Sequence, residues 1–290
     1  MKSLGRRKAL LGLSAIAFAA CSRGERKGGA ARVVSLSPST TETMFAIGAG
    51  DLLVGRSRYC DYPKEAERLP VVGGYADPNV EAIVALAPTL VVGARGPAGP
   101  ALEQGLHAHG IETFFPETES LAGITGMIRE LGRRVGREAD GARVAGAIEA
   151  KRKDVAAAVG DKPRLKVLFL FDVAPVIAAG PGSFPDELLR LAGAENVIQR
   201  GGAYPTIGLE HLLALAPDLL LDGASEVHAG RTLREMLADA PGWRELAAVR
   251  EGRIRPVGSD ALRPGPRIGE GLWAVARAVH GDALSSPPPP

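Results

Sequence analysis

The chain has 290 residues, of which 46% are hydrophobic and 23% are charged, so it is a globular protein rather than a disordered one. Its formal charge of +2 depends on four basic residues near the N-terminus, because the remaining 31 basic and 33 acidic residues give −2. A near-neutral chain gives no support to nucleic-acid binding. Aromatic residues are scarce at 4%, which makes each exposed aromatic side chain informative.

The N-terminus has the order of an export signal. Residues 2–8 carry four basic side chains and no acidic one, residues 9–20 form an apolar run too short to span a bilayer, and Cys21 follows. This order resembles a bacterial lipoprotein signal, in which cleavage leaves the cysteine to carry lipid. We therefore predict a signal peptide at 1–20 and a lipoprotein tether at 21–30. Arg6-Arg7 leaves twin-arginine export open beside the Sec route.

Strands and helices alternate in the first part of the mature chain. The apolar runs and their breaks predict strands and helices at 33–36, 40–47, 53–55, 79–86, 90–92, 98–109 and 112–115. Ser39, three residues before Glu42, is a capping-box pattern and predicts the start of the first helix. This alternation is typical of an α/β lobe with a largely parallel sheet.

Two helical stretches without strands follow, at 120–135 and 138–159. At 1.5 Å per residue the second would be roughly 33 Å long, enough to bridge two lobes. The alternation then returns, with elements expected at 165–171, 184–191, 209–215, 219–221, 233–237, 243–247, 254–257 and 267–280. The proline-rich residues 285–290 predict a disordered tail.

An internal repeat relates the two α/β parts. Residues 80–93 (VEAIVALAPTLVVG) and 209–222 (LEHLLALAPDLLLD) are identical at six of fourteen positions, with a constant offset of 129 residues. We predict two Rossmann-like lobes of related plan, at 31–119 and 164–284, joined through a helical linker at 120–163 that contains one long backbone helix.

The sequence contains no recognisable catalytic arrangement. It has no phosphate loop, no dinucleotide-binding glycine pattern, no H-E-x-x-H and no G-x-S-x-G. The five histidines are scattered, so no metal site is predicted, and nothing near Cys60 suggests an activating base. An exported two-lobed protein without such groups is best explained by capture of a ligand between its lobes, and an exported hydrolase is the weaker alternative.

Several motifs together resemble the substrate-binding proteins of the cobalamin and ferric-siderophore ABC importers, and within them the periplasmic cobalamin-binding proteins. They are Arg32–Pro38 (RVVSLSP), Thr41-Glu42, Ser57–Pro63 (SRYCDYP), Pro78–Ile83 (PNVEAI), Tyr204–Glu210 (YPTIGLE) and Ser259-Asp260. The resemblance covers about residues 31–280. It implies two Rossmann-like lobes joined by a single long helix, an importer component rather than an enzyme, and a periplasmic location with an ABC permease and ATPase as partners. It implies no cofactor and no metal site, the ligand being cobalamin.

The resemblance also implies ligand-binding residues, namely Tyr59, Tyr75, Tyr204, Asp260 and Arg263. A corrin ring is a broad, partly apolar plate edged with amides, and tyrosines offer it a large contact area with a polar tip. Two other ligands stay open. A ferric siderophore would use clustered arginines, which Arg58, Arg95 and Arg263 could supply, and haem would need an iron ligand, for which Tyr59 is the candidate.

Glu81 and Glu210 occupy equivalent positions of the repeat, each near a predicted helix start. One such carboxylate in each lobe would suit docking to a permease made of a two-fold pair of subunits, and in the resembling family these residues form salt bridges with permease arginines. The alternative is that each glutamate only complements its helix dipole.

Overall fold

The computed structural model describes residues 31–96, 99–223, 231–258 and 262–284. The predictions of a signal peptide, a tether, lipidation at Cys21, a ligand contact at Asp260 and a C-terminal tail fall on residues outside these ranges. In the described residues, no helix combines the length and the apolar character that a membrane span requires.

The N-terminal lobe is built on a parallel sheet of four strands in the order β2-β1-β3-β4. The strands are β1 (Val33–Ser35), β2 (Leu53–Arg56), β3 (Leu90–Val92) and β4 (Glu112–Phe114), and the helices are α1 (Pro38–Ala46), α2 (Val80–Ala85) and α3 (Gly99–Ala108). β1 and β3 are buried along their whole length, as expected for central strands covered on both faces. Short 3₁₀ turns at Gly50–Leu52 and Lys64–Arg68 complete the connections.

The C-terminal lobe has a sheet in which β5 pairs with β6, β7 and β8, and β8 with β9. All pairs are parallel except β5–β6. The elements are β5 (Lys166–Val173), β6 (Val176–Ala178), α6 (Phe184–Leu191), β7 (Glu195–Asn196), α7 (Leu209–Leu215), β8 (Leu219–Asp222), α8 (Leu233–Asp239), α9 (Ala247–Arg250) and β9 (Ile254–Pro256), with a 3₁₀ turn at Trp243–Glu245.

The repeat in the sequence corresponds to equivalent structure in both lobes. α2 and α7 begin 129 residues apart, as do β3 and β8. The helices end alike, because Ala87 (φ 46°) and Ala216 (φ 45°) both adopt the left-handed conformation just before a proline. This conformation is costly for alanine, by about 1 kcal/mol. Its presence at the same point of both lobes indicates one shared helix–proline–strand plan.

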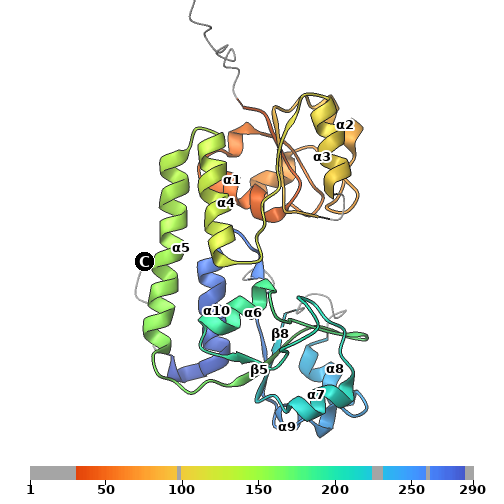
Figure 1. The fold of residues 1–290 in the computed structure, drawn as a ribbon, viewed down its shortest axis with the longest axis vertical. Coiled ribbons are helices and arrows are strands. Elements are labelled where there is room, and N and C mark those ends of the chain that lie inside the picture. Colours follow the sequence, from red (N-terminus) through yellow and green to blue (C-terminus); the bar gives the residue numbers. More distant parts are fainter. Residues whose placement is uncertain (1–30, 97–98, 224–230, 259–261, 285–290) are drawn as a thin grey trace, which may run out of the picture. The chain divides into compact units, whose positions relative to one another are not determined.

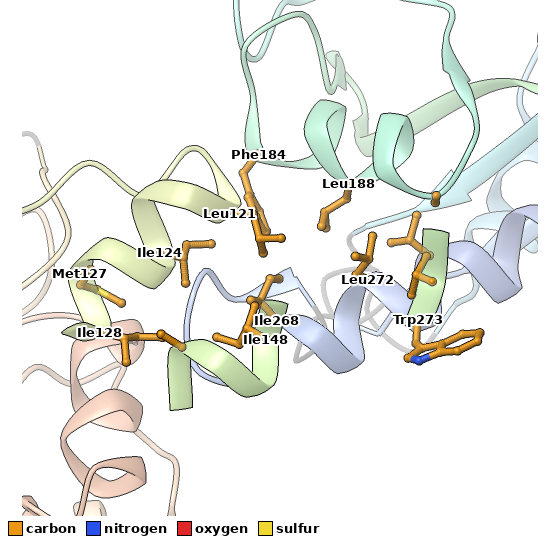
Figure 2. Close-up of a cluster of buried hydrophobic side chains, with 14 of the residues drawn as sticks. Leu121, Ile124, Met127, Ile128, Ile148, Phe184, Leu188, Ile268, Leu272 and Trp273 are labelled. Carbon is orange, nitrogen blue, oxygen red and sulfur yellow. The ribbon is translucent and has the colours of Figure 1, made fainter. Parts of the chain in front are cut away.

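Three helices form a layer along both lobes: α4 (Leu121–Arg134), α5 (Glu138–Val159) and α10 (Ile268–His280) (Figure 1). α5 packs against both α4 and α10, and α10 also contacts α6 of the C-terminal lobe. Buried residues of α5 recur at helical spacing, at Val144, Ala145, Ile148, Val155 and Val159. Figure 2 shows apolar side chains of α4, α5, α6 and α10 meeting in one cluster, so the layer and the lobes share a core.

The long helix predicted at 138–159 is present with the same bounds. The capping box predicted at Ser39 and Glu42 is wrong. The N-cap is Ser37, whose hydroxyl accepts a hydrogen bond from the Thr40 N–H, and Pro38 occupies the first turn. Glu42 is instead held by an arginine 225 residues away, and this tertiary partner overrides the local pattern.

Candidate ligand-binding site

All four tyrosines of the chain are exposed, although most of its other large apolar side chains are buried. Tyr59 and Tyr75 lie in the connection that follows β2, and Tyr204 lies in the connection between β7 and α7. These connections begin at the carboxyl ends of parallel strands, which is where α/β sheets bind ligands. We call Tyr59, Tyr75 and Tyr204 the tyrosine surface.

Glu119 brings the two lobes together at this surface. The Tyr204 hydroxyl donates a hydrogen bond to Glu119 Oε2 over 3.2 Å, and the ring of Tyr204 packs edge-on against Phe171. Burial together with the nearby Glu119 carboxylate raises the pKa of Tyr204. The same two causes, with Glu117 in addition, raise the pKa of Tyr75. The hydrogen bond from Tyr204 therefore links the C-terminal lobe to the segment that precedes α4.

Tyr75 is fixed at its polar end. Its hydroxyl donates to the Arg95 carbonyl over 2.6 Å, and its ring lies so close to Gly96 that an added Cβ there would come within 2.8 Å of it. The ring also lines a small hollow with Leu36, Leu102 and Phe115. The ring of Tyr75 is therefore held in one orientation by its hydroxyl contact and by Gly96, and it does not rotate freely.

Tyr59 lies beside a charged pair. The guanidinium of Arg58 is 5.8 Å from the centre of its ring and makes a two-pronged ion pair with Asp77, over 2.9 and 2.8 Å. This pair raises the pKa of Arg58 and lowers that of Asp77. Since Asp77 is two residues from Tyr75, the pair connects Tyr59 with Tyr75.

The three arginines considered for an anionic ligand all have carboxylate partners. Arg58 pairs with Asp77, Arg95 Nε lies 2.7 Å from Glu117, and Arg263 Nη1 lies 2.7 Å from Asp61. The hydrogen bond from Arg263 also holds the pKa of Asp61 below its usual value. These cations are neutralised within the protein, so they do not form a positively charged pocket.

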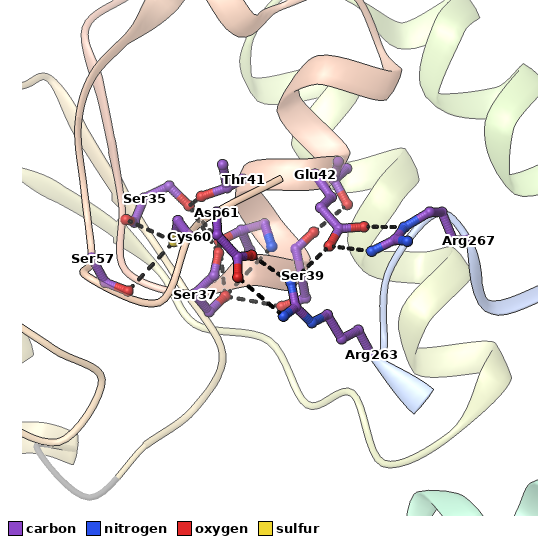
Figure 3. A network of polar contacts seen from close by, with 12 residues as sticks. Ser35, Ser37, Ser39, Thr41, Glu42, Ser57, Cys60, Asp61, Arg263 and Arg267 are labelled. Carbon is purple, nitrogen blue, oxygen red and sulfur yellow. Dashed lines mark hydrogen bonds and ion pairs between the residues drawn. The ribbon is translucent and has the colours of Figure 1, made fainter. Parts of the chain in front are cut away.

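A second polar cluster joins the N-terminal lobe to the segment that precedes α10 (Figure 3). Arg267 binds Glu42 through two hydrogen bonds of 2.8 and 2.9 Å, and Arg263 Nη1 lies 3.5 Å from the same carboxylate. The side chain of Glu42 is only 2% exposed. Arg267 also lies over the ring of Tyr62, at 4.2 Å. The fourth tyrosine therefore belongs to this cluster, in which its ring packs beneath a guanidinium.

The proposed docking glutamates lie where the repeat places them. Glu81 is in the first turn of α2 and Glu210 in the first turn of α7, and both are exposed. Neither carboxylate makes a hydrogen bond or an ion pair with any residue that the structure describes. Both are thus available to a partner, although the dipole interaction applies to them as well.

Two other groups weighed in the sequence take structural positions. Cys60 is buried, with its sulfur 3.4 Å from Ser57 Oγ, so packing accounts for it. Across the ranges that the structure covers, no three histidine, cysteine or acidic side chains gather closely enough to hold a metal ion.

Sequence patterns indicated no role for Glu119 or Tyr62, and a different role for Glu42. Glu119 lies 85 residues from Tyr204, in a stretch without any motif. The only available signal was the location of all four tyrosines outside the predicted strands and helices.

Comparison with known proteins supports this architecture. A sequence profile of the periplasmic binding protein family matches residues 33–261. A vitamin B12-binding protein of Vibrio parahaemolyticus is 30% identical over 244 residues, covering 81% of this chain and 84% of that protein. A cobalamin-binding protein of Halobacterium salinarum is 28% identical over 260 residues, covering 87% and 70%.

Solved structures agree with the fold. The periplasmic vitamin B12 binding protein BtuF of Vibrio cholerae superposes with a TM-score of 0.74 at 26% identity, covering 86% of this chain and 96% of that one. The periplasmic haem-binding protein RhuT of Roseiflexus sp. RS-1 gives 0.76 at 26% identity, covering 88% and 100%. The predicted two-lobed α/β fold with a backbone helix is therefore confirmed, and the chain belongs to the periplasmic binding protein family.

Proposed function

We propose that this chain is the substrate-binding protein of an ABC importer and that it captures a corrinoid, cobalamin being the best candidate, at the tyrosine surface. The relatives named above bind vitamin B12 or cobalamin, and members of this family are binding proteins rather than enzymes.

The observation that carries the choice of ligand is the combination of exposed tyrosines with neutralised arginines. Tyr59, Tyr75 and Tyr204 offer aromatic faces and edges that suit a broad, amide-edged plate. Haem carries two propionates and many siderophores are anionic, so both would need unpaired cations. Because Arg58, Arg95 and Arg263 already bind carboxylates, the site favours a neutral plate. Haem stays the second candidate, since RhuT shares the fold.

Isothermal titration calorimetry with cyanocobalamin, haemin and a ferric siderophore tests this assignment. We expect one molecule of cyanocobalamin to bind per chain, and Tyr59→Ala to weaken binding by about 1–3 kcal/mol, as for other aromatic anchors. Tyr62→Ala is the matched control, because this similarly exposed tyrosine packs beneath Arg267. No heat with cyanocobalamin but strong binding of haemin or the siderophore would contradict the proposal.

We further propose that Glu81 and Glu210 dock on basic residues of a two-fold permease. Their equivalent positions, exposure and lack of a described partner support this role. Glu81→Lys or Glu210→Lys should weaken association with the permease and reduce transport, while ligand affinity stays unchanged. A role confined to the helix dipole predicts instead a stability loss of about 0.3–1 kcal/mol and normal transport. Unaltered docking of the double variant would refute the proposal.

For location, we propose a periplasmic protein anchored to a membrane by lipid on Cys21. The family is one of periplasmic binding proteins, and the signal pattern at residues 1–21 supports export. In the native host, Cys21→Ser should move the protein from the membrane fraction to the soluble fraction. Retention of that variant in membranes would rule out this anchor.

A further inference from the structure

Glu119 differs from the other acidic residues around the tyrosine surface. Asp61, Asp77 and Glu117 each pair with an arginine. Glu119 has no cationic partner among the residues that the structure describes, and its side chain is exposed. It therefore contributes a negative charge that the protein does not neutralise.

The hydrogen bonds of Glu119 use only one of its oxygens. Oε2 accepts from the Tyr204 hydroxyl over 3.2 Å and from the Phe184 N–H, at the start of α6, over 3.0 Å. Oε1 accepts no hydrogen bond from any residue within the described ranges. The two bonds to Oε2 fix the carboxylate in place, and Oε1 remains available to accept a hydrogen bond from a ligand.

This fixed position follows from a reciprocal arrangement of two helix starts. Glu119 caps the first N–H of α6, while Glu187 of α6 accepts from the first N–H of α4, at Leu121, over 2.6 Å. The first backbone N–H of each helix thus donates to a carboxylate: that of α6 to Glu119, just before α4, and that of α4 to Glu187 of α6. Glu119 also accepts a hydrogen bond from Tyr204, a tyrosine of the candidate site. Glu187 has no such contact with a tyrosine among the described residues, and its other partner is Arg190.

We infer that Glu119 is a specificity-determining residue of the tyrosine surface. Its carboxylate disfavours ligands with anionic edges, and its Oε1 accepts an N–H from a side-chain amide of a neutral or cationic corrinoid. A plate resting on Tyr75 and Tyr204 would displace water near this carboxylate. The repulsion of a carboxylate on the ligand would then be stronger than in open solvent. This inference rests on the proposed function, whose site it refines.

The test compares two ligands that differ in one charge. Cyanocobalamin and its monocarboxylic acids, in which one side-chain amide is hydrolysed, have the same plate, and the ratio of their dissociation constants isolates the effect of charge. In the wild type we expect the acids to bind more weakly. In Glu119→Gln the ratio of dissociation constants, acid over cyanocobalamin, should fall by about 5-fold or more for at least one acid. In the wild type, the same ratio should decrease as salt is added, because salt screens the repulsion.

Glu187→Gln is the control, because it alters the other half of the same helix-capping arrangement. It should leave the ratio within about 2-fold of the wild type. If Glu119→Gln changes both ligands by the same factor, as Glu187→Gln would, then Glu119 is only a helix cap and the inference is overturned.

Titration with haemin distinguishes failure of the role inferred for Glu119 from failure of the proposed function. If the wild type binds haemin but no corrinoid, the proposed function fails. The inference is then judged on the propionates, and Glu119→Gln should tighten haemin binding by about 5-fold or more. Unchanged haemin affinity in that case would overturn the role of Glu119 as well.

Discussion

At the scale of single residues, several charged side chains are paired within the protein, and the pairing matters most where the charge is buried. The deepest example is Glu42, a carboxylate 2% exposed that accepts two hydrogen bonds from Arg267. A buried carboxylate without its partner is strongly destabilising, because its desolvation is then not compensated. The pair joins α1 to the segment before α10, so it also fixes the position of the N-terminal lobe on the helical layer.

We therefore expect Arg267→Ala to lower the free energy of unfolding by about 3 kcal/mol, with Arg263 left as a weaker partner for Glu42. Denaturation in urea measures this loss. The control is Arg133→Ala, which removes an ion pair with Glu130 on the surface of α4 and should cost at most about 1 kcal/mol. Equal losses of unfolding free energy in the two variants would contradict the expectation that the buried Glu42 depends more on its arginine than a surface carboxylate does.

At the scale of elements, close helix packing depends on a few small residues. α4 and α5 approach each other at Gly132 and Gly141, where a Cβ on Gly132 would lie 2.8 Å from the Arg137 carbonyl oxygen and 3.1 Å from the Cα of Gly141. Backbone atoms cannot move aside as a flexible side chain can. The two helices can keep their present separation only while this position has no side chain.

Gly132→Ala should accordingly destabilise the protein by about 2 kcal/mol, although alanine favours helix formation over glycine by about 1 kcal/mol. Gly126→Ala in the same helix is the control. A Cβ at Gly126 meets nothing within 4 Å, so this variant should be about 1 kcal/mol more stable than the wild type. Thermal or urea denaturation of both variants gives the comparison, and the same sign of change in both would contradict the packing argument.

Periodicity and turn residues predicted most of the elements, because those signals are local. The long helix at 138–159 and the helices at 184–191 and 209–215 were predicted with the bounds they have. The short strands β6 and β7 were missed, since a few residues that pair with β5 leave no pattern of their own. The candidate site was predicted only in part. A motif can place Tyr204 in a loop, but its contact with Glu119 depends on how two distant loops pack.

At the scale of the whole molecule, one hydrophobic core extends across both lobes. The same cluster contains Val33 and Val92 of the N-terminal sheet, Ile128 and Ile148 of the helical layer, and Phe169 of the C-terminal sheet. Smaller clusters lie beneath the outer helices, with Ile83 of α2 in one and Leu212 of α7 in the other. These two residues are 129 positions apart and are equivalent in the repeat. The lobes thus resemble each other, but they are not independent of each other.

A shared core should make unfolding a single cooperative transition, even though the sequence suggests two lobes. In differential scanning calorimetry we expect one peak whose calorimetric and van't Hoff enthalpies agree. Ile83→Ala and Leu212→Ala, each costing about 3 kcal/mol, should lower this one peak by similar amounts rather than split it. A bound ligand should move the whole peak upward, because it binds only the folded state. If Ile83→Ala instead produced an early transition that left a second one unchanged, the N-terminal lobe would be unfolding alone. The core described here would then be too weak to couple the lobes.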